Sequence, residues 1–286
     1  MMQKPYRSVY FLLFFISNTF FSQSLLSENS LLWKISGKDL QQSSYILITY
    51  PEVCNQDFVL DNQIVKTIQS VDQYVMPINL GDESQLYEDI MSRSKVPVIE
   101  GLTNEEIVLL KKHIGKLDET YEDAKGESAL LIFGMARMKF FNNCAYDFRE
   151  MPMEYMQIAL NNKKTTIGLE EAKDMNKSVN AIYSSKKLIQ TLLHFDQVKN
   201  LYQKGSKAYS SGNLDEAYKN LTNELVLDDQ EKRIMIEDRN SKWLDKIIGH
   251  LASKSSVFAI PIENAYGDKG IINLIKGKGY KIVSTH

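Results

Sequence analysis

The two ends of the chain carry the same short pattern, in which an apolar strand leads into a polar turn and then into an amphipathic helix. It reads YILITYPEVCNQDFVLDNQIVKTI at residues 45–68 and VFAIPIENAYGDKGIINLIKGKG at residues 257–279. Units of this kind build parallel sheets and place ligand-binding or catalytic groups in the turns that follow the strands. We therefore expect both turns to lie at one edge of a common sheet, with a shared cleft there.

Apolar and β-branched runs predict the remaining strands, and helical spacing predicts what lies between them. A run at 73–80 contains Pro77, which suggests a sheet edge or a bulge, because proline cannot donate to a strand ladder. A helix is expected over about 57–71, and a capping box opens another at Thr103. The other expected strands are residues 31–36, 43–50, 165–170, 257–262 and 280–284.

Helical patterns fill most of the middle of the chain. The fold class that this order predicts is α/β, with a mixed sheet formed by the N- and C-terminal strand-loop-helix units. A large helical insertion is expected at about 100–160 and 175–254. Residues 207–225 resemble half of a tetratricopeptide unit, but no second copy follows, so a helix pair within the insertion is the preferred interpretation over a peptide-binding repeat.

The first residues have the layout of a secretory signal peptide. Lys4 and Arg7 precede an apolar run at 9–21, and SQS follows it. We expect a signal peptide at 1–23, leaving a domain at 24–286 that is exported, periplasmic or secreted and has no stable membrane span. An uncleaved anchor is the alternative.

Charge and cysteine content fit that destination. The formal net charge is −2, from 34 Lys and Arg against 36 Asp and Glu, and no basic stripe appears, so nucleic-acid binding is not expected. Cys54 and Cys144 are an even pair, and a disulfide between them is expected in an oxidising compartment. Two buried free thiols are the alternative.

Five segments, in this order and spacing, resemble the TraB/PrgY/GumN proteins. The resemblance spans residues 31–284 and implies an α/β fold with a metal-dependent hydrolase site, built from two Gly-x-x-His motifs and acidic residues. The segments are LLWKISGKDLQQSSYILITYPEV (31–53), DQYVMPINL (72–80), TTIGLEEA (165–172), EDRNSKW (237–243) and FAIPIENAYGDKGIINLIKGKGYKI (258–282).

Aligned on these segments, the chain departs from the motifs of the family at the positions that matter most. The histidine of the first motif falls on Pro51 and that of the second on Asn264, while the acidic strand end falls on Pro77 and Asn79. Three matches to the family remain, namely Glu170, Arg239 and Asn240. The first motif as a whole falls on Ile48, Thr49, Tyr50 and Pro51, and the second on Pro261, Ile262, Glu263 and Asn264.

These departures limit metal chemistry. Proline offers no side-chain donor, and a hydrolytic metal needs several converging N, O or S ligands. Glu263 and Asn264 could supply oxygens to a hard cation, so no cofactor is expected unless a divalent metal binds a rebuilt site. The four histidines show no ligand spacing and are expected as ordinary helix or terminal residues: His113, His194, His250 and His286.

Acid–base catalysis without metal remains a second hypothesis. Glu170 and Glu263 both end expected strands and could meet at the shared edge. The competing interpretation makes Glu170 a solvated strand-end carboxylate and Glu263 a helix N-terminal charge. Arg239 has two interpretations as well: it holds an anionic or carbonyl group of a ligand, or it pairs with Glu170 and ties the insertion to the sheet, which we favour.

The leading functional hypothesis is an exported protein with a degenerate metal-hydrolase site. It would be a pseudoenzyme rather than an enzyme and would bind a peptide or another envelope component in the old cleft. The alternative is a metal-dependent or acid–base peptidase or hydrolase that uses a site rebuilt from the candidate residues, which are Glu170, Arg239, Asn240, Glu263 and Asn264.

Overall fold

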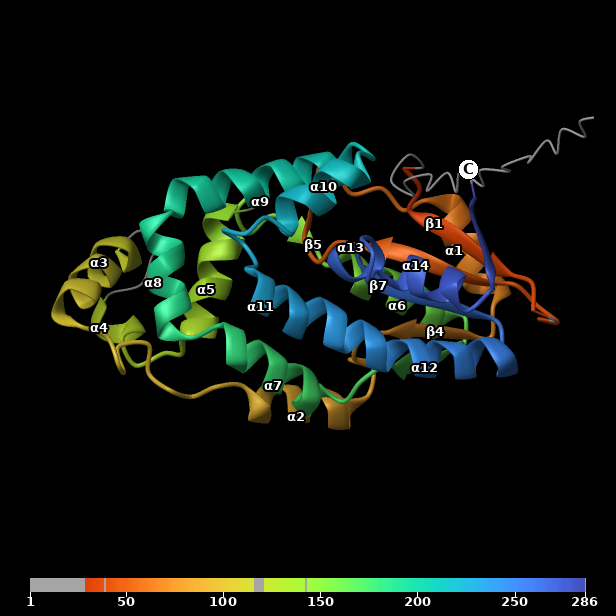
Figure 1. The fold of residues 1–286 in the computed structure, drawn as a ribbon, viewed down its shortest axis with the longest axis horizontal. Coiled ribbons are helices and arrows are strands. Elements are labelled where there is room, and N and C mark those ends of the chain that lie inside the picture. The colour runs from red at the N-terminus through yellow and green to blue at the C-terminus, as the bar shows by residue number, and fades with distance from the viewer. Residues whose placement is uncertain (1–28, 39, 116–120, 142, 286) are drawn as a thin grey trace, which may run out of the picture.

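A six-stranded mixed sheet forms one end of the computed structural model (Figure 1). The structure describes residues 29–38, 40–115, 121–141 and 143–285, so the expected signal peptide lies outside the described residues. Within the part that is described, none of the helices combines the length and apolar character needed to cross a bilayer. In sheet order the strands are β6 (Thr165–Gly168), β4 (Gln73–Met76), β7 (Ser256–Pro261), β2 (Ser44–Thr49), β1 (Leu32–Ser36) and β8 (Lys281–Ser284).

Strands from both ends of the chain lie next to each other in the sheet. β2 pairs with β7 in parallel, with Ile48 opposite Ile260 and Thr49 opposite Pro261. β4 runs parallel to both β7 and β6, whereas β1 is antiparallel to β2 and β8. The predicted α/β class with a mixed sheet is therefore confirmed, and the two polar turns do meet at one edge.

Two boundaries differ from those that the sequence predicts. The run at 73–80 is not an edge strand: β4 ends at Met76, before Pro77, and lies between β6 and β7. The missing N–H of proline explains where the strand stops, because an interior strand needs every donor. The helix expected from residue 57 begins at Asn62, because the side chain of Asp61 accepts from two backbone N–H groups at its start.

Helices cover both faces of the sheet and continue beyond it. Helices α12 and α14 lie in front of the sheet in Figure 1, with α6 behind it, and α3, α4, α5 and α8 form the far end. The helices near the sheet are α1 (Asn62–Ser70), α6 (Met151–Asn161), α12 (Asp238–Ser253), α13 (Ile262–Ala265) and α14 (Ile271–Gly277). The others are α2 (Glu83–Ser92), α3 (Asn104–Ile114), α4 (Tyr121–Ala124), α5 (Ala129–Ala136), α7 (Ala172–Ile182), α8 (Ser185–Leu193), α9 (Phe195–Ser210), α10 (Leu214–Leu221) and α11 (Asp229–Lys232), with π-helical turns η2 (Arg137–Phe141) and η3 (Arg233–Glu237).

The tetratricopeptide-like segment is a helix pair, as predicted. Helices α9 and α10 pack on each other across a turn that Gly212 closes with a φ of +79°. The close approach depends on Gly205, because a Cβ there would lie 3.0 Å from Leu221 Cγ.

The predicted disulfide between Cys54 and Cys144 is present, with the two Cα atoms 5.7 Å apart. Cys54 ends β3 (Val53–Cys54), a short strand that pairs with β5 (Phe148–Arg149). The bond therefore connects the segment just after β2 to the segment just after η2.

Candidate functional site

The motif positions identified from the sequence gather at one edge of the sheet. Because β2, β4, β6 and β7 are parallel, their carboxyl ends meet there. Pro51 follows β2, Pro77 follows β4 and Glu170 follows β6, while Glu263 and Asn264 lie in α13, directly after β7. Ile48, Thr49 and Tyr50 are buried, and Pro51 and Pro261 are half-buried.

Glu170 and Arg239 form an ion pair within the protein. The Arg239 Nε and Nη2 atoms donate to Glu170 Oε1 at 3.0 and 2.5 Å, and Nη1 donates to the Met235 carbonyl. The two side chains keep only 8% and 12% of their surface exposed, and the guanidinium lies over the Trp243 ring. The interpretation of Glu170 as a solvated strand-end carboxylate is therefore wrong, and the pairing that ties α12 to the sheet is the observed one.

Asn240 fastens the loop after β7 to the same helix. Its Nδ2 atom donates to the carbonyls of Asn264 and Lys269 at 2.9 and 2.8 Å, and its Oδ1 accepts from Asn264 Nδ2. Asn264 Nδ2 also donates to the Met235 carbonyl. Both asparagines are buried, so three hydrogen bonds hold the loop to α12 and one more holds it to η3.

Glu263 lies at a helix N-terminus, as the sequence predicts. It is in the first turn of α13 and is half-buried. Burial raises the pKa of Glu263, against the opposing effect of Arg137 and Arg239. Because a one-turn helix contributes little dipole, desolvation outweighs the helix N-terminus here.

A second ion pair lies beside Glu263, and the sequence analysis missed it. Arg137, at the start of η2, donates from Nη2 to Glu52 Oε1 at 2.6 Å. Burial raises the pKa of Glu52, and Arg137 opposes that change. The Glu52 side chain is 7% exposed, whereas that of Arg137 is 37% exposed, so the pair is reachable from one side.

Two signals in the sequence point to this pair. Glu52 directly follows the position of the first motif histidine, and Arg137 lies inside an apolar helical run, ALLIFGMARMKFF, whose one other charged residue is Lys139. Arginine is rarely buried unless it is paired, so its place in that run predicts a partner carboxylate.

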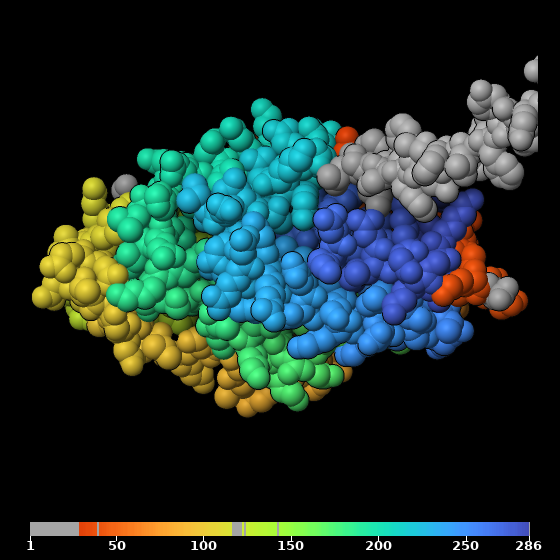
Figure 2. Space-filling model, viewed as in Figure 1, coloured from red at the N-terminus to blue at the C-terminus, as the bar shows by residue number. Residues whose placement is uncertain are grey.

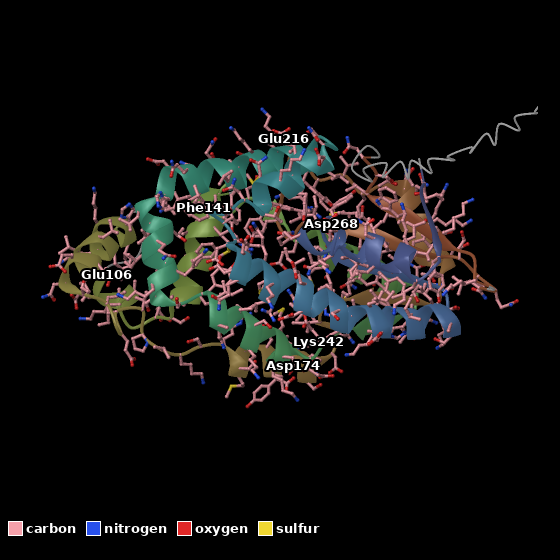
Figure 3. All side chains as sticks on the ribbon, in the orientation of Figure 1. Glu106, Phe141, Asp174, Glu216, Lys242 and Asp268 are labelled. Atoms are coloured by element: carbon pink, nitrogen blue, oxygen red, sulfur yellow. A yellow bond between two sulfur atoms is a disulfide. The ribbon has the colours of Figure 1, made fainter. Side chains whose placement is uncertain are left out.

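Tyrosines complete the environment of the pair. Tyr50 stacks on Tyr209 with ring centroids 5.3 Å apart, and Tyr202 stacks on Phe141, which Figure 3 labels, at 5.2 Å. Burial raises the pKa of Tyr50, Tyr183 and Tyr202, and the Glu263 charge adds to each shift. We call the following set the tyrosine–arginine cluster: Tyr50, Glu52, Arg137, Tyr183, Tyr202 and Glu263.

A surface hollow of about 210 Å³ borders the loop after α13. Tyr218 and Tyr266 line it with their rings at 6.2 Å, together with Lys232 and with Asp268, which Figure 3 labels beside α14. The hollow carries both signs of charge and an aromatic wall, which suits a polar ligand of mixed charge rather than a purely anionic one.

The residues at this edge do not fit a hydrolytic metal. Prolines occupy positions 51, 77 and 261 and offer no side-chain ligand, and Glu170 Oε1 accepts from Arg239. The Asn79 Oδ1 atom is buried without a hydrogen-bond partner among the described residues, but one amide oxygen is not the converging ligand set that a hydrolytic metal needs. Within the part of the chain that the structure describes, no group of three or more His, Cys, Asp or Glu side chains is placed to hold an ion. We therefore derive no catalytic step through a metal.

Comparison with known proteins gives one result, a match to a protein family. A family model described as "TraB/PrgY/gumN family" matches residues 31–284 of the chain. Neither a curated protein nor a solved structure matches the chain.

Proposed function

Because the chain belongs to the TraB/PrgY/gumN family, we propose that it is an exported, non-catalytic member that binds a peptide or another envelope component. The proposed binding site is the tyrosine–arginine cluster at the edge where the motif positions of the family lie. Export is supported by the signal-like leader in the sequence and by the disulfide, which persists in oxidising compartments.

The observation that carries the proposal is that the residues matching the family pattern form hydrogen bonds and an ion pair within the protein. Of the three matches, Arg239 bonds to Glu170 and to a backbone carbonyl of η3, and Asn240 bonds to backbone carbonyls of the loop. Asn264, at the position of the second motif histidine, bonds to Asn240 and to η3. Groups that are engaged in this way hold the scaffold together, and they have few donors or acceptors left for a substrate. A structural role is therefore enough to explain the residues that the chain shares with the family pattern, and no catalytic role is needed.

The cluster has the properties of a binding surface. Tyr183, Arg137 and Glu263 are half-buried and so partly exposed to a ligand, while Tyr50 and Tyr202 are buried. Tyrosine offers an apolar body and a polar tip, and arginine adds a planar donor group. The Arg137 Nε atom is buried and finds no acceptor among the described residues, and such a donor calls for a partner from a ligand or from water.

A hydrolase that works without metal is the second candidate, and one observation favours it. Burial raises the pKa of both Glu52 and Glu263, and a carboxylic acid with a raised pKa can act as a general acid or base near neutral pH. In this alternative the two carboxylates, rather than Glu170, would carry the chemistry.

Selection from a displayed library of short peptides tests the binding proposal. The wild-type protein should enrich a sequence consensus, and Tyr183→Ala or Arg137→Gln should lose that enrichment. Tyr45→Ala is the matched control, because Tyr45 is also a half-buried tyrosine but lies at the opposite end of β2. If no consensus emerges above the background of a blank surface, peptide binding is refuted.

Activity measurements on the same variants separate the two candidates. Hydrolysis of a peptide or ester pool by the wild type that is lost in both Glu52→Gln and Glu263→Gln, with unfolding free energies retained, would establish the catalytic alternative. Peptide binding by the wild type without any turnover supports the non-catalytic protein.

A further inference from the structure

Helix α2 is oriented with its apolar side chains outward. Four large hydrophobic residues are exposed on it, whereas its one buried side chain is the carboxylate Asp89. The exposed fractions are 45% for Leu86, 67% for Tyr87, 55% for Ile90 and 49% for Met91. A solitary exposed apolar residue is ordinary, but a helix that inverts its pattern marks an interaction surface.

Polar contacts fix this orientation from the inner side. Asn176 Nδ2 of α7 donates to the Asp89 carbonyl at 2.8 Å and to Asp89 Oδ1 at 2.9 Å. Gln85 donates to Glu171 and accepts from the Ala172 N–H. Turning the apolar face inward would break these bonds, so the exposure of the four residues is built into the packing of α2 on α7.

The four residues form one continuous stripe. Their spacing of i, i+1, i+4 and i+5 places Leu86 and Ile90 in one row and Tyr87 and Met91 in the next, on the same side of the helix. Helix α2 lies at the lower rim of the molecule, below α7, and the orange atoms of this part of the chain stand uncovered at the surface (Figures 1 and 2).

Charges of opposite sign lie at the two ends of α2. Acidic Asp82 and Glu83 lie at its start, and Arg93 and Lys95 follow its end. A second α2 lying antiparallel would bring the acidic start of each helix to the basic end of the other and would oppose the two helix dipoles favourably.

We propose that this stripe, Leu86, Tyr87, Ile90 and Met91, is the surface through which two copies of the chain associate. The two-fold axis passes between Glu88 and Asp89. That register sets Leu86 against the partner's Met91 and Tyr87 against the partner's Ile90, and it places Asp82 opposite the partner's Lys95. Each contact occurs twice, as an isologous interface requires.

The charge pattern favours a second copy over a lipid surface. Helices that lie in a membrane interface carry lysine and arginine on their polar face. In α2 the exposed charges at the helix start are Asp82 and Glu83, which an anionic bilayer would repel. A stripe of four side chains is also smaller than the roughly 800 Å² per partner of a stable complex, so we expect weak association, with a Kd above about 1 μM.

Sedimentation of the protein obtained from the full 286-residue chain, over a wide concentration range, is the first test. The wild type should pass from monomer to dimer, and Ile90→Asp should raise the Kd at least tenfold. Val108→Asp is the matched control, because Val108 of α3 is 69% exposed outside the stripe. Asp82→Lys and Lys95→Glu should each weaken the dimer, because the register sets these two residues opposite each other, and the double variant should restore it.

Cysteine cross-linking tests the register. A mixture of Leu86→Cys and Met91→Cys chains should form a mixed disulfide dimer under mild oxidation, while neither variant should cross-link alone. In the proposed register two copies of Leu86 are offset by about 7.5 Å along the axis, beyond the usual Cα separation of a disulfide. A monomer at all concentrations, association unchanged by Ile90→Asp, or binding of the stripe to anionic vesicles instead would overturn the proposal.

Discussion

Removal of the disulfide should lower the stability of the protein by a calculable amount. Cys54 and Cys144 are separated by 90 residues, so their bond closes a long loop in the unfolded chain. The chain-entropy relation gives about 4.6 kcal/mol at 25 °C for a loop of that length. For a protein of this size that corresponds to a fall in Tm of roughly 9–18 °C.

The double variant Cys54→Ala with Cys144→Ala tests this value by urea unfolding, followed by circular dichroism. The loss of local stability should also differ from one part of the chain to another. Because the bond lies close in sequence to both Glu52 and Arg137, amide exchange should accelerate most between residues 137 and 149, while β2 and β7 keep their protection. An unfolding free energy within about 1 kcal/mol of the wild type would refute the reasoning, since it falls far below the loop-closure value.

Three further predictions concern the edge of the sheet. Asn240→Ala should lower the unfolding free energy by about 2–4 kcal/mol, because it leaves buried carbonyls without donors, and urea titration measures this. Arg239→Met should cost about 3–5 kcal/mol by leaving the Glu170 charge unpaired, whereas adding Glu170→Gln should recover much of the loss; additive effects would contradict a direct pair. Glu263 has a raised pKa when folded, so its contribution to stability is present below the unfolded value of about 4.3 and is lost as the pH rises through the folded pKa. Glu263→Gln should flatten that decline in unfolding free energy between pH 4 and pH 8, and an unchanged slope would show that another group causes it.

The sheet was predictable because its signals are local. Alternating and β-branched runs locate the strands, and the repeated strand-turn-helix pattern predicts that the two turns lie at one edge of the sheet, which the parallel pairing of β2 with β7 confirms. Strand ends were less certain. Pro77 suggests a sheet edge or a bulge, whereas β4 ends at Met76 and pairs with two neighbours.

The site was predicted in part, for a physical reason. The pairing of Glu170 with Arg239 is one of the two interpretations that the sequence allows for Arg239, because both residues match the family pattern. The partner of Arg137 was not, because Glu52 lies far from it in sequence and only tertiary packing joins them. The raised pKa of Glu263 does not follow from the sequence either, since its main cause is burial in the folded chain.

The central claim is that the family's motif positions no longer form a hydrolytic metal site. Metal content of the purified protein, measured by elemental analysis together with thermal shift in Mn²⁺, Co²⁺, Zn²⁺ and Ca²⁺ before and after chelation, tests it most directly. The account predicts substoichiometric metal and a Tm that none of these ions changes. One equivalent of metal per chain, with a stabilisation that disappears in Glu263→Ala but not in Glu170→Gln, would contradict it.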